Sequence, residues 1–426
     1  MSNSIFQDPL RRRWVGWGIL AIIFLLVSLH RLSTAVLSEN LTRAFHLTAT
    51  QLGILHAVFF IIYAAVQIPI GILVDRVGPR RVGSCGAVLL SAGAIGFALS
   101  STYLTALTSR GIIGLGSGAI FISIVRFCAN WFRPNEFATM TGITGAVSGV
   151  GSILATTPLA VTTATIGWRV TVLLLGVIGV VTGGGVYVFV RDSPVDASLD
   201  SIDGLTQHST ISLSQTTRYL RNLSMDADQW LLSFIFFATN GTILTIFGLW
   251  GVPYLVIVYD LSITTASKYT LLGSVGMLVG GPTIGYIADK IEHRYLPLTA
   301  GVGLFTIALS TLAIVGKPPL VVVALVYIIS GFVIGSGLLT ITVIKERYPR
   351  DASGMATSVV NGSAFIGASV LPWIMGKLLD TYRLDTGVDG TTTYSQYGYQ
   401  IAFGLVSVVL LFAFCCSVAI WIRDHP

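Results

Sequence analysis

The chain has 426 residues, of which 53% are hydrophobic and only 10% are charged. A typical soluble domain carries roughly 25% charged residues, so this chain has too few to cover the surface of a water-soluble globule. A membrane-spanning helix needs about 20 mostly apolar residues, and twelve such helices would use about 240 residues. The composition therefore excludes a soluble protein and predicts an all-α polytopic membrane protein with twelve transmembrane helices.

Long apolar segments recur along the chain with short polar gaps between them. They are neither short nor alternating, so they do not fit β-barrel strands, and helices are the remaining way to satisfy the backbone in a bilayer. The predicted spans are 14–37, 51–74, 82–101, 104–132, 137–164, 168–190, 229–257, 265–289, 295–316, 319–342, 352–379 and 399–422. The first span is too long for a cleavable signal and no small-residue cleavage site ends it.

A polar stretch in the middle of the chain separates six predicted spans from six. We therefore predict two pseudo-symmetric six-helix bundles, 1–190 and 229–426, joined by a cytoplasmic linker at 191–228 with a short amphipathic helix near Arg218. The four cysteines lie in apolar runs and lack metal-ligand or redox spacing: Cys85, Cys128, Cys415 and Cys416. No metal and no cofactor are expected.

Positive charge gathers on one side of the predicted topology and sets the orientation. With a cytoplasmic N-terminus, that side carries Arg11, Arg12, Arg13, Arg76, Arg80, Arg81, Arg133, Arg191, Arg218, Arg221, Lys290, Arg294, Lys345, Arg347, Arg350 and Arg423. The opposite side carries Arg43, Arg169, Lys268, Lys317, Lys377 and Arg383. Because positive charge stays inside, we expect a multi-pass protein of the inner (plasma) membrane with both termini cytoplasmic.

Three arginines, Arg31, Arg110 and Arg126, fall within predicted spans, where no Asp or Glu lies well inside. A cation at mid-membrane costs about 2.5–3.5 kcal/mol, so each is a candidate for function. The positive charge without a buried carboxylate predicts an anionic substrate, which the planar guanidinium suits. Arg110 and Arg126 are separated by about 160° around one helix, so they are not expected to share a ligand. Arg110 is equally consistent with helix packing, and Arg126 with snorkelling to the cytoplasm.

Two loops repeat one motif half a chain apart. The first contains Gly71, Asp75, Arg76, Gly78, Pro79, Arg80 and Arg81, and the second Gly285, Asp289, Lys290 and Arg294. Gly, Asp, the first base and a later Arg recur at a constant offset of 214 residues. The repeat indicates a duplicated six-helix unit, as in many transporters.

The first loop resembles the G-x-x-x-D-R-x-G-R-R signature of the major facilitator superfamily, with Pro79 inserted. Residues 110–118 resemble that family's R-x-x-x-G-x-G element, whereas the Gly-Pro pair of the antiporter signature is absent from 142–158. The resemblance implies a secondary transporter with alternating access. In such a fold Asp75 would face the start of span eleven near Asp351, and Asp289 would face the start of span five near Glu136. Breaking and remaking these contacts would gate alternating access, so the two repeated loops are named the first and the second gating loop. The alternative is that the arginines of the loop only set topology.

An arginine late in span one and another opening span four also resemble the organic anion:cation symporter branch. That branch commonly carries Glu seven residues after the span-four arginine, where this chain has Ser117. The remaining candidates for proton coupling are His30 and His56, since imidazole titrates near neutral pH. A lone histidine within a membrane is more often a hydrogen-bonded packing residue, and if neither histidine carries a proton, anion exchange or facilitated diffusion remains. The lining that the resemblance implies adds Tyr63, Gln67, Asn240, Trp250, Tyr254 and Asn361 as substrate-binding candidates. Trp250 and Tyr254 could instead belong to an interfacial aromatic belt.

The leading prediction is a secondary active transporter of a small organic anion of the carboxylate type, with proton coupling left open. The alternatives are a transporter of neutral or zwitterionic solutes such as sugars or small peptides, and a non-transporting sensor on the same fold. No phosphate-binding loop and no catalytic constellation is present, so neither ATP hydrolysis nor an enzyme is expected. We expect a monomer in the lipid bilayer, with a small-molecule substrate, H⁺ as a candidate partner and no nucleic acid.

Overall fold

The structure, a computed structural model, describes residues 8–200, 202, 223, 225–348, 350–384 and 393–424. Almost all of them are helical, and 11 helices are long and apolar enough to span a membrane. The number becomes 12 if the pair α3 and α4, which is bent by 47°, forms one span. The predicted all-α polytopic fold is therefore confirmed.

The helices follow the predicted spans. The first part of the chain forms α2 (Pro9–Phe45), α3 (Ala49–Ala65), α4 (Gln67–Val77), α5 (Pro79–Leu99), α6 (Tyr103–Trp131), α7 (Pro134–Leu154), α8 (Thr157–Ile166), α9 (Trp168–Phe189) and the 3₁₀ turn η1 (Val195–Ala197). The second part forms α11 (Ala227–Thr245), the π-helical η2 (Ile246–Trp250), α12 (Gly251–Tyr259), α13 (Ile263–Lys290), α14 (Tyr295–Val315), α15 (Leu320–Phe332), α16 (Ile334–Arg347), α17 (Arg350–Thr381) and α18 (Gln396–Asp424). The helix predicted near Arg218 lies outside the described residues.

The chain divides into two compact units by its internal packing. Unit 1 comprises Met1–Arg31 and Ile61–Ser209, and unit 2 comprises Leu32–Phe60 and Thr210–Pro426. The end of α2 and most of α3 therefore pack with the C-terminal helices, although they precede the rest of the N-terminal ones in sequence. The boundaries of the two predicted bundles, at residues 190 and 229, stay a prediction.

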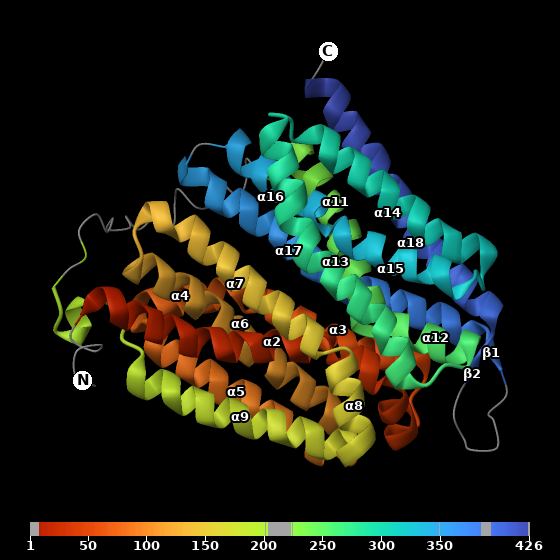
Figure 1. The fold of residues 1–426 in the computed structure, drawn as a ribbon, viewed down its shortest axis with the longest axis horizontal. Helices are drawn as coiled ribbons and strands as arrows, with labels where there is room; N and C mark the ends of the chain where they lie inside the picture. Colours follow the sequence, from red (N-terminus) through yellow and green to blue (C-terminus); the bar gives the residue numbers. More distant parts are fainter. Residues whose placement is uncertain are drawn as a thin grey trace. The chain divides into compact units, whose positions relative to one another are not determined.

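Small residues let the helices of unit 1 approach closely. α5 lies between α6 and α9 (Figure 1). A Cβ added at Gly116 of α6 would lie 2.4 Å from the backbone nitrogen of Leu90 in α5, and one at Gly183 of α9 would lie 2.8 Å from the Cβ of Ala87. Glycine at these positions allows backbone-to-backbone contact, the usual packing of membrane helices.

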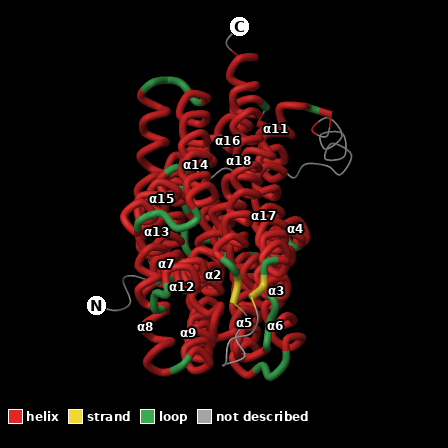
Figure 2. The backbone as a smooth tube through the Cα atoms, turned by 90° about the vertical axis from the view of Figure 1, so that its right-hand side faces the viewer, coloured by secondary structure: helices red, strands yellow, loops and turns green. Residues whose placement is uncertain are grey.

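Two features interrupt the helices of unit 2. Figure 2 shows the short antiparallel strands β1 (Arg383–Leu384) and β2 (Thr393–Tyr394), which follow α17 and precede α18. Between α11 and α12, the five residues of η2 form a π-helical turn. Such turns often mark functional positions, because the widened turn releases backbone carbonyls. Here the Tyr327 hydroxyl donates to the Gly251 carbonyl at 2.8 Å.

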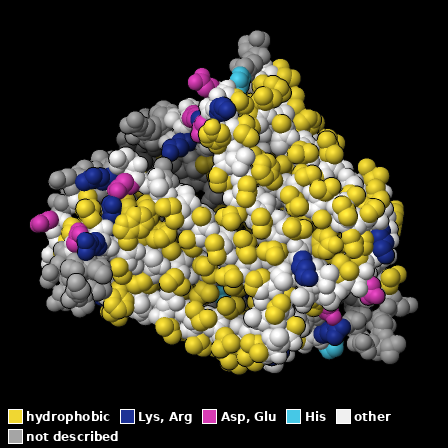
Figure 3. Space-filling model, in the orientation of Figure 1, with side chains coloured by type: hydrophobic (Ala, Val, Ile, Leu, Met, Phe, Trp, Pro, Cys, Tyr) yellow, Lys and Arg dark blue, Asp and Glu magenta, His cyan; other side chains and the backbone are white. Residues whose placement is uncertain are grey.

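The surface carries many exposed apolar side chains, as expected for helices that face lipid. Hydrophobic groups cover most of the face drawn in Figure 3, and charged groups gather toward its edges. Ile314, Val321 and Val181 are among the most exposed of these residues. A water-soluble protein would rarely leave so large an apolar area uncovered. The multi-pass membrane assignment therefore rests on the surface as well as on helix length.

Candidate substrate site and gating loops

Arg31 lies in α2, in unit 1, beside the aromatic ring of Tyr63 from α3. The guanidinium carbon is 5.8 Å from the ring centroid, and Nε is buried with no hydrogen-bond partner among the described residues. The ion pairs of the described residues do not include Arg31. Gln67, four residues beyond Tyr63, follows the break at Val66. Buried charge without a carboxylate is costly, so an anionic ligand here would be stabilising.

Arg110 has a backbone partner within unit 1. Its guanidinium donates to the carbonyl of His30 at 3.0 Å, and its side chain is almost fully buried. The ring of Phe97 lies beside it, with its centroid 5.9 Å from the guanidinium carbon. Of the two interpretations left open for Arg110, these contacts favour helix packing, because they fasten α6 to α2. The backbone of His30 serves that contact, and its side chain is buried.

Arg126 has a carboxylate partner that its position within a span concealed. Its Nε lies 3.4 Å from Oδ1 of Asp75, near the end of α4. Arg126 is about one third exposed and Asp75 more than half exposed. The pair therefore joins α6 to the first gating loop, and Arg126 is not an uncompensated cation. The same unit contains a bidentate pair that sequence reasoning missed, in which Arg13 donates to Glu136 at 2.8 and 2.9 Å.

His56 lies in unit 2, where its ring is fully buried against the π-helical turn. A Cβ added at Gly248 would lie 2.8 Å from Cε1 of His56, so this close approach requires glycine. The ring centroid of Phe60 is 5.0 Å from that of His56. The second proton-coupling candidate is thus held between α3 and η2. Its placement beside an irregular turn is compatible with either packing or titration.

The aromatic candidates of span seven have structural partners in unit 2. Trp250 donates from Nε1 to the Pro372 carbonyl at 3.1 Å, and the Tyr254 hydroxyl donates to the Gly316 carbonyl at 2.8 Å. Both side chains are almost fully buried, which disfavours a lipid-facing aromatic belt. Asn240 and Asn361 are half-buried and stay candidates.

The first gating loop is fastened to the segment after α9. Gly78 has φ of +91°, and a Cβ there would lie 2.4 Å from the Asp192 carboxyl carbon. The backbone N–H of Arg80, in the first turn of α5, donates to Asp192 at 2.7 Å. Arg80 also donates from Nε to the Tyr187 carbonyl at 2.7 Å. A carboxylate at a helix N-terminus is favourable, so Asp192 supplies a cap that α5 lacks in its own sequence.

Asp192 gives the loop a predictable pH dependence. Burial, the largest cause, raises the pKa of Asp192 above its usual 3.8. The native state then binds more protons than the unfolded state, so stability falls as pH rises from about 3.8 to the higher native value. Asp192→Asn keeps a carbonyl acceptor but cannot titrate, so we expect its melting temperature to change less with pH across this range. Melting curves at several pH values would check it, and an unaltered slope would contradict it.

The second gating loop is closed by ion pairs within unit 2. Arg294 pairs with Asp289 and lies 3.3 Å from a carboxylate oxygen of Glu346. The hydrogen bond to Asp289 is the main reason that the pKa of Arg294 is raised. A Cβ would meet nothing within 4 Å at Gly71 or Gly285, so steric need does not explain glycine at these positions. For Arg76 and Lys290 the expected gating role stays a prediction, as does the pairing of Asp75 with span eleven, whose Asp351 side chain lies outside the described ones.

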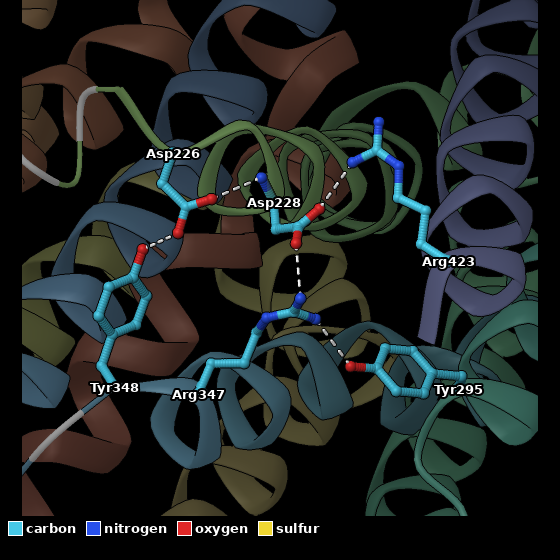
Figure 4. Close-up of polar contacts among 6 residues, drawn as sticks. All are labelled: Asp226, Asp228, Tyr295, Arg347, Tyr348 and Arg423. Carbon is cyan, nitrogen blue, oxygen red and sulfur yellow. Dashed lines mark hydrogen bonds and ion pairs between the residues drawn. The ribbon is translucent and has the colours of Figure 1, made fainter. Parts of the chain in front are cut away.

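A polar cluster fastens the helix ends of unit 2 together. Figure 4 draws its members: Asp226, Asp228, Tyr295, Arg347, Tyr348 and Arg423. Asp228 accepts hydrogen bonds from Arg347 at 2.6 Å and Arg423 at 3.0 Å. The Arg347 guanidinium reaches the Tyr295 hydroxyl, and the Tyr348 hydroxyl donates to Asp226. These contacts join the start of α11 to the ends of α16 and α18, and none of them was visible as a motif.

A cavity of about 520 Å³ lies in unit 2. Its lining includes Glu39, Arg43, Trp250, Asp260 and Tyr394. Arg43 is paired with Glu39 at 2.6 Å, so the cation in this lining is already neutralised. Among the described residues that line it, the cavity therefore has no unpaired cation for an anionic ligand.

Comparison with known proteins decides the family. The family model described as Major Facilitator Superfamily matches residues 16–372 and 270–426. The chain belongs to the Major Facilitator Superfamily. The resemblance to this superfamily is thereby confirmed, and so is the prediction that the protein is not an enzyme.

Relatives and solved structures of the superfamily agree with this assignment. The hexuronate transporter of Bacillus subtilis (strain 168) is 25% identical over 78% of this chain and 80% of its own length. The membrane sensor protein UhpC of Escherichia coli (strain K12) is 23% identical over 79% of both chains. A bacterial homologue of the human lysosomal transporter Spinster, inward-facing and unoccupied, gives a TM-score of 0.77 at 17% identity, covering 95% of this chain and 97% of its own. This last likeness concerns the fold alone.

Proposed function

We propose that this facilitator-superfamily protein is a secondary active transporter of a small organic anion of the carboxylate type. The observation that carries the proposal is Arg31, a largely buried guanidinium with no carboxylate partner among the described residues. A substrate carboxylate would supply the missing negative charge, and the planar fork would orient it. Tyr63, whose ring lies beside Arg31, and Gln67, four residues farther along the chain, are candidates for contact with the rest of the substrate.

Sugar acids are the subclass that we propose first. The hexuronate transporter among the relatives carries molecules with one carboxylate and several hydroxyl groups. Arg31 suits the carboxylate, and the hydroxyl group of Tyr63 and the amide group of Gln67 suit the hydroxyl groups of a sugar acid. The sensor UhpC among the relatives keeps a second candidate in view, a sensor without transport.

We propose further that the protein lies in the inner membrane with both termini cytoplasmic, as the arginine and lysine distribution favours. On this orientation the Arg126–Asp75 pair lies at the cytoplasmic end of spans two and four. His30 and His56 are the groups that we propose for proton coupling, because no buried carboxylate offers an alternative within the described spans.

The gating role of Asp75 can be tested directly. Asp75→Asn removes the partner charge of Arg126, so we expect transport to slow by about threefold through an altered balance of conformations. Initial uptake rates and cysteine accessibility at the cytoplasmic ends would check it. Equal rates together with equal accessibility would refute the role. Asp8→Asn provides a control at another acid near the same end, since Asp8 forms an exposed ion pair with Arg11 and accepts from the Leu10 N–H, a hydrogen bond that asparagine can also accept.

Uptake into proteoliposomes tests the function itself. Purified protein should accumulate labelled glucuronate or galacturonate, and unlabelled carboxylate should compete while glucose and galactose should not. Imposing an inward proton gradient tests coupling, because a proton symporter then accumulates substrate above equilibrium. Specific binding of sugar acids without uptake would favour the sensor. Competition by neutral sugars alone would contradict the anion assignment.

A further inference from the structure

The N-terminus of α3 receives a carboxylate from a distant helix. The first N–H groups of a helix have no hydrogen-bond partner inside the helix. At the start of α3 the Thr48 N–H donates to the Gln51 side chain at 3.0 Å, and the Gln51 N–H donates to the Thr48 hydroxyl at 3.2 Å. The N–H groups of Ala49 and Thr50 donate instead to Asp380, at 2.8 and 2.9 Å, one to each carboxylate oxygen. Because α3 has no acidic residue in its own first turn, Asp380 is the charge that complements this helix end.

Asp380 belongs to α17, and α3 and α17 also touch along a continuous line of contacts, here named the seam, that runs from this cap to Phe60 and Phe365. A Cβ at Gly376 of α17 would lie 2.4 Å from the Ala49 carbonyl, and one at Gly53 of α3 would lie 2.7 Å from the Pro372 carbonyl. The two backbones are therefore in direct contact at two levels. Contacts of this kind are tight and apolar, but they carry no charge that would favour one conformation strongly.

Polar and aromatic contacts continue the seam toward the middle of α3. Ser369 donates to the Ala57 carbonyl at 3.4 Å, and the rings of Phe365 and Phe60 stack with centroids 6.4 Å apart. From Asp380 back to Phe365 the contacts of α17 recur every three or four residues, which is one face of a helix. This face therefore covers most of the length of α3 up to Phe60.

The division of α3 between the units gives the seam its significance. The seam uses residues up to Phe60, which cluster in unit 2, whereas Ile61 and the residues after it cluster in unit 1. The chain then bends by 47° between α3 and α4. A single span therefore carries a segment bound to the C-terminal helices and a segment bound to the N-terminal ones. A transporter that alternates must break one of these attachments in each cycle.

We propose that Asp380 is a latch on the outer end of span two: its carboxylate holds the N-terminus of α3 against α17, and transport requires its release. Tyr394 of β2 supports the latch from the other side, since its hydroxyl lies 3.4 Å from Oδ1 of Asp380. The inference rests on the transport and orientation proposed above. With this latch, the outer end of the protein has a charged contact between helices, as the inner end has at the gating loops.

Cysteine accessibility on α17 tests the latch without any substrate. In a background with Cys85, Cys128, Cys415 and Cys416 replaced by serine, Ser369→Cys reports on the seam, where Ser369 is 4% exposed. Ser358→Cys reports on the other half of the same helix, where Ser358 is exposed. Asp380→Asn places an amide against two N–H donors and removes the charge. We expect maleimide labelling at position 369 to accelerate about fivefold and labelling at position 358 to slow.

The controls separate a latch from local damage. Asp260→Asn removes another acid of unit 2, one that is exposed, and should change neither rate, because Asp260 is not in the seam. Thr50→Val deletes one hydroxyl contact to Asp380 and should shift both rates in the direction of Asp380→Asn by a smaller factor. Opposite changes at the two reporters support the latch. No change at either, or faster labelling at both, would overturn it, and neither result depends on which substrate the protein carries.

Discussion

Replacement of Arg31 by alanine is expected to lower carboxylate uptake by about 100-fold while the protein remains folded. A hydrogen bond to a charged group is worth about 1.5–3 kcal/mol, which corresponds to a factor of about 10 to 150 in binding. Arg31 has no carboxylate partner among the described residues, so its removal leaves no buried charge uncompensated. We therefore expect a loss of transport without a loss of thermal stability. Initial uptake rates and melting temperatures of the same preparations would check both parts.

Two further variants make this expectation specific. Arg31→Lys keeps the charge and loses the planar fork, so uptake should fall to an intermediate level. Arg43→Ala removes an exposed arginine that is paired with Glu39 and should leave uptake near that of the wild type. Unchanged uptake in Arg31→Ala would remove Arg31 from the site, and equal losses in all three variants would point to a general effect of positive charge.

The helices were predictable because the bilayer imposes a simple rule on sequence. Each predicted span overlaps a helix or a bent pair of helices, since apolar length alone decides whether a segment can cross. The two breaks were not predicted, although each has a signal in the sequence. Pro69 follows the bend at Val66 by three residues, and Pro253 follows the π-helical turn at Ile246–Trp250 by three residues. A proline cannot donate a hydrogen bond to the carbonyl four residues before it, so a helix commonly bends or loosens there.

The candidate site was predictable only as far as charge could be counted along the chain. The scarcity of buried acids led to Arg31, Arg110 and Arg126, but each has a different environment in the structure. Arg110 reaches a backbone carbonyl 80 positions away, and Arg126 reaches a carboxylate at the end of another helix. Backbone carbonyls carry no sequence signal, so the different partners of Arg110 and Arg126 could be found only in the structure.

The same limit applies to the acids at the helix ends. Asp192, Asp228 and Asp380 look like ordinary loop or terminal acids in the sequence, yet each fastens two or more helices. Their partners are N–H groups and cations from elements far along the chain. For Asp192 and Asp380 the available signal is the lack of an acid in the first turn of α5 and of α3, since the N-terminus of such a helix can accept a carboxylate from another element.

Glycine content, in contrast, predicted close packing that can be measured one position at a time. In α13, Gly276 and Gly280 meet the backbone of α15, whereas a Cβ at Gly273 would meet the ring of Phe247 in η2. A Cβ at Gly280 would lie 1.9 Å from the carbonyl oxygen of Phe332, whereas one at the neighbouring Gly281 would meet only Cδ1 of Leu338, at 3.9 Å. The two glycines share one helix and differ in the room beside them.

Gly280→Ala is therefore expected to destabilise the protein and Gly281→Ala to leave it unharmed. Forcing a methyl group into a packed backbone contact costs typically 1–3 kcal/mol, which corresponds to a melting temperature lower by about 5 °C. At Gly281 the space is free, and alanine favours the helix by about 1 kcal/mol over glycine. Melting curves of purified protein in one detergent would compare the two directly. Equal melting temperatures for the two variants would contradict the close backbone contact between Gly280 and Phe332.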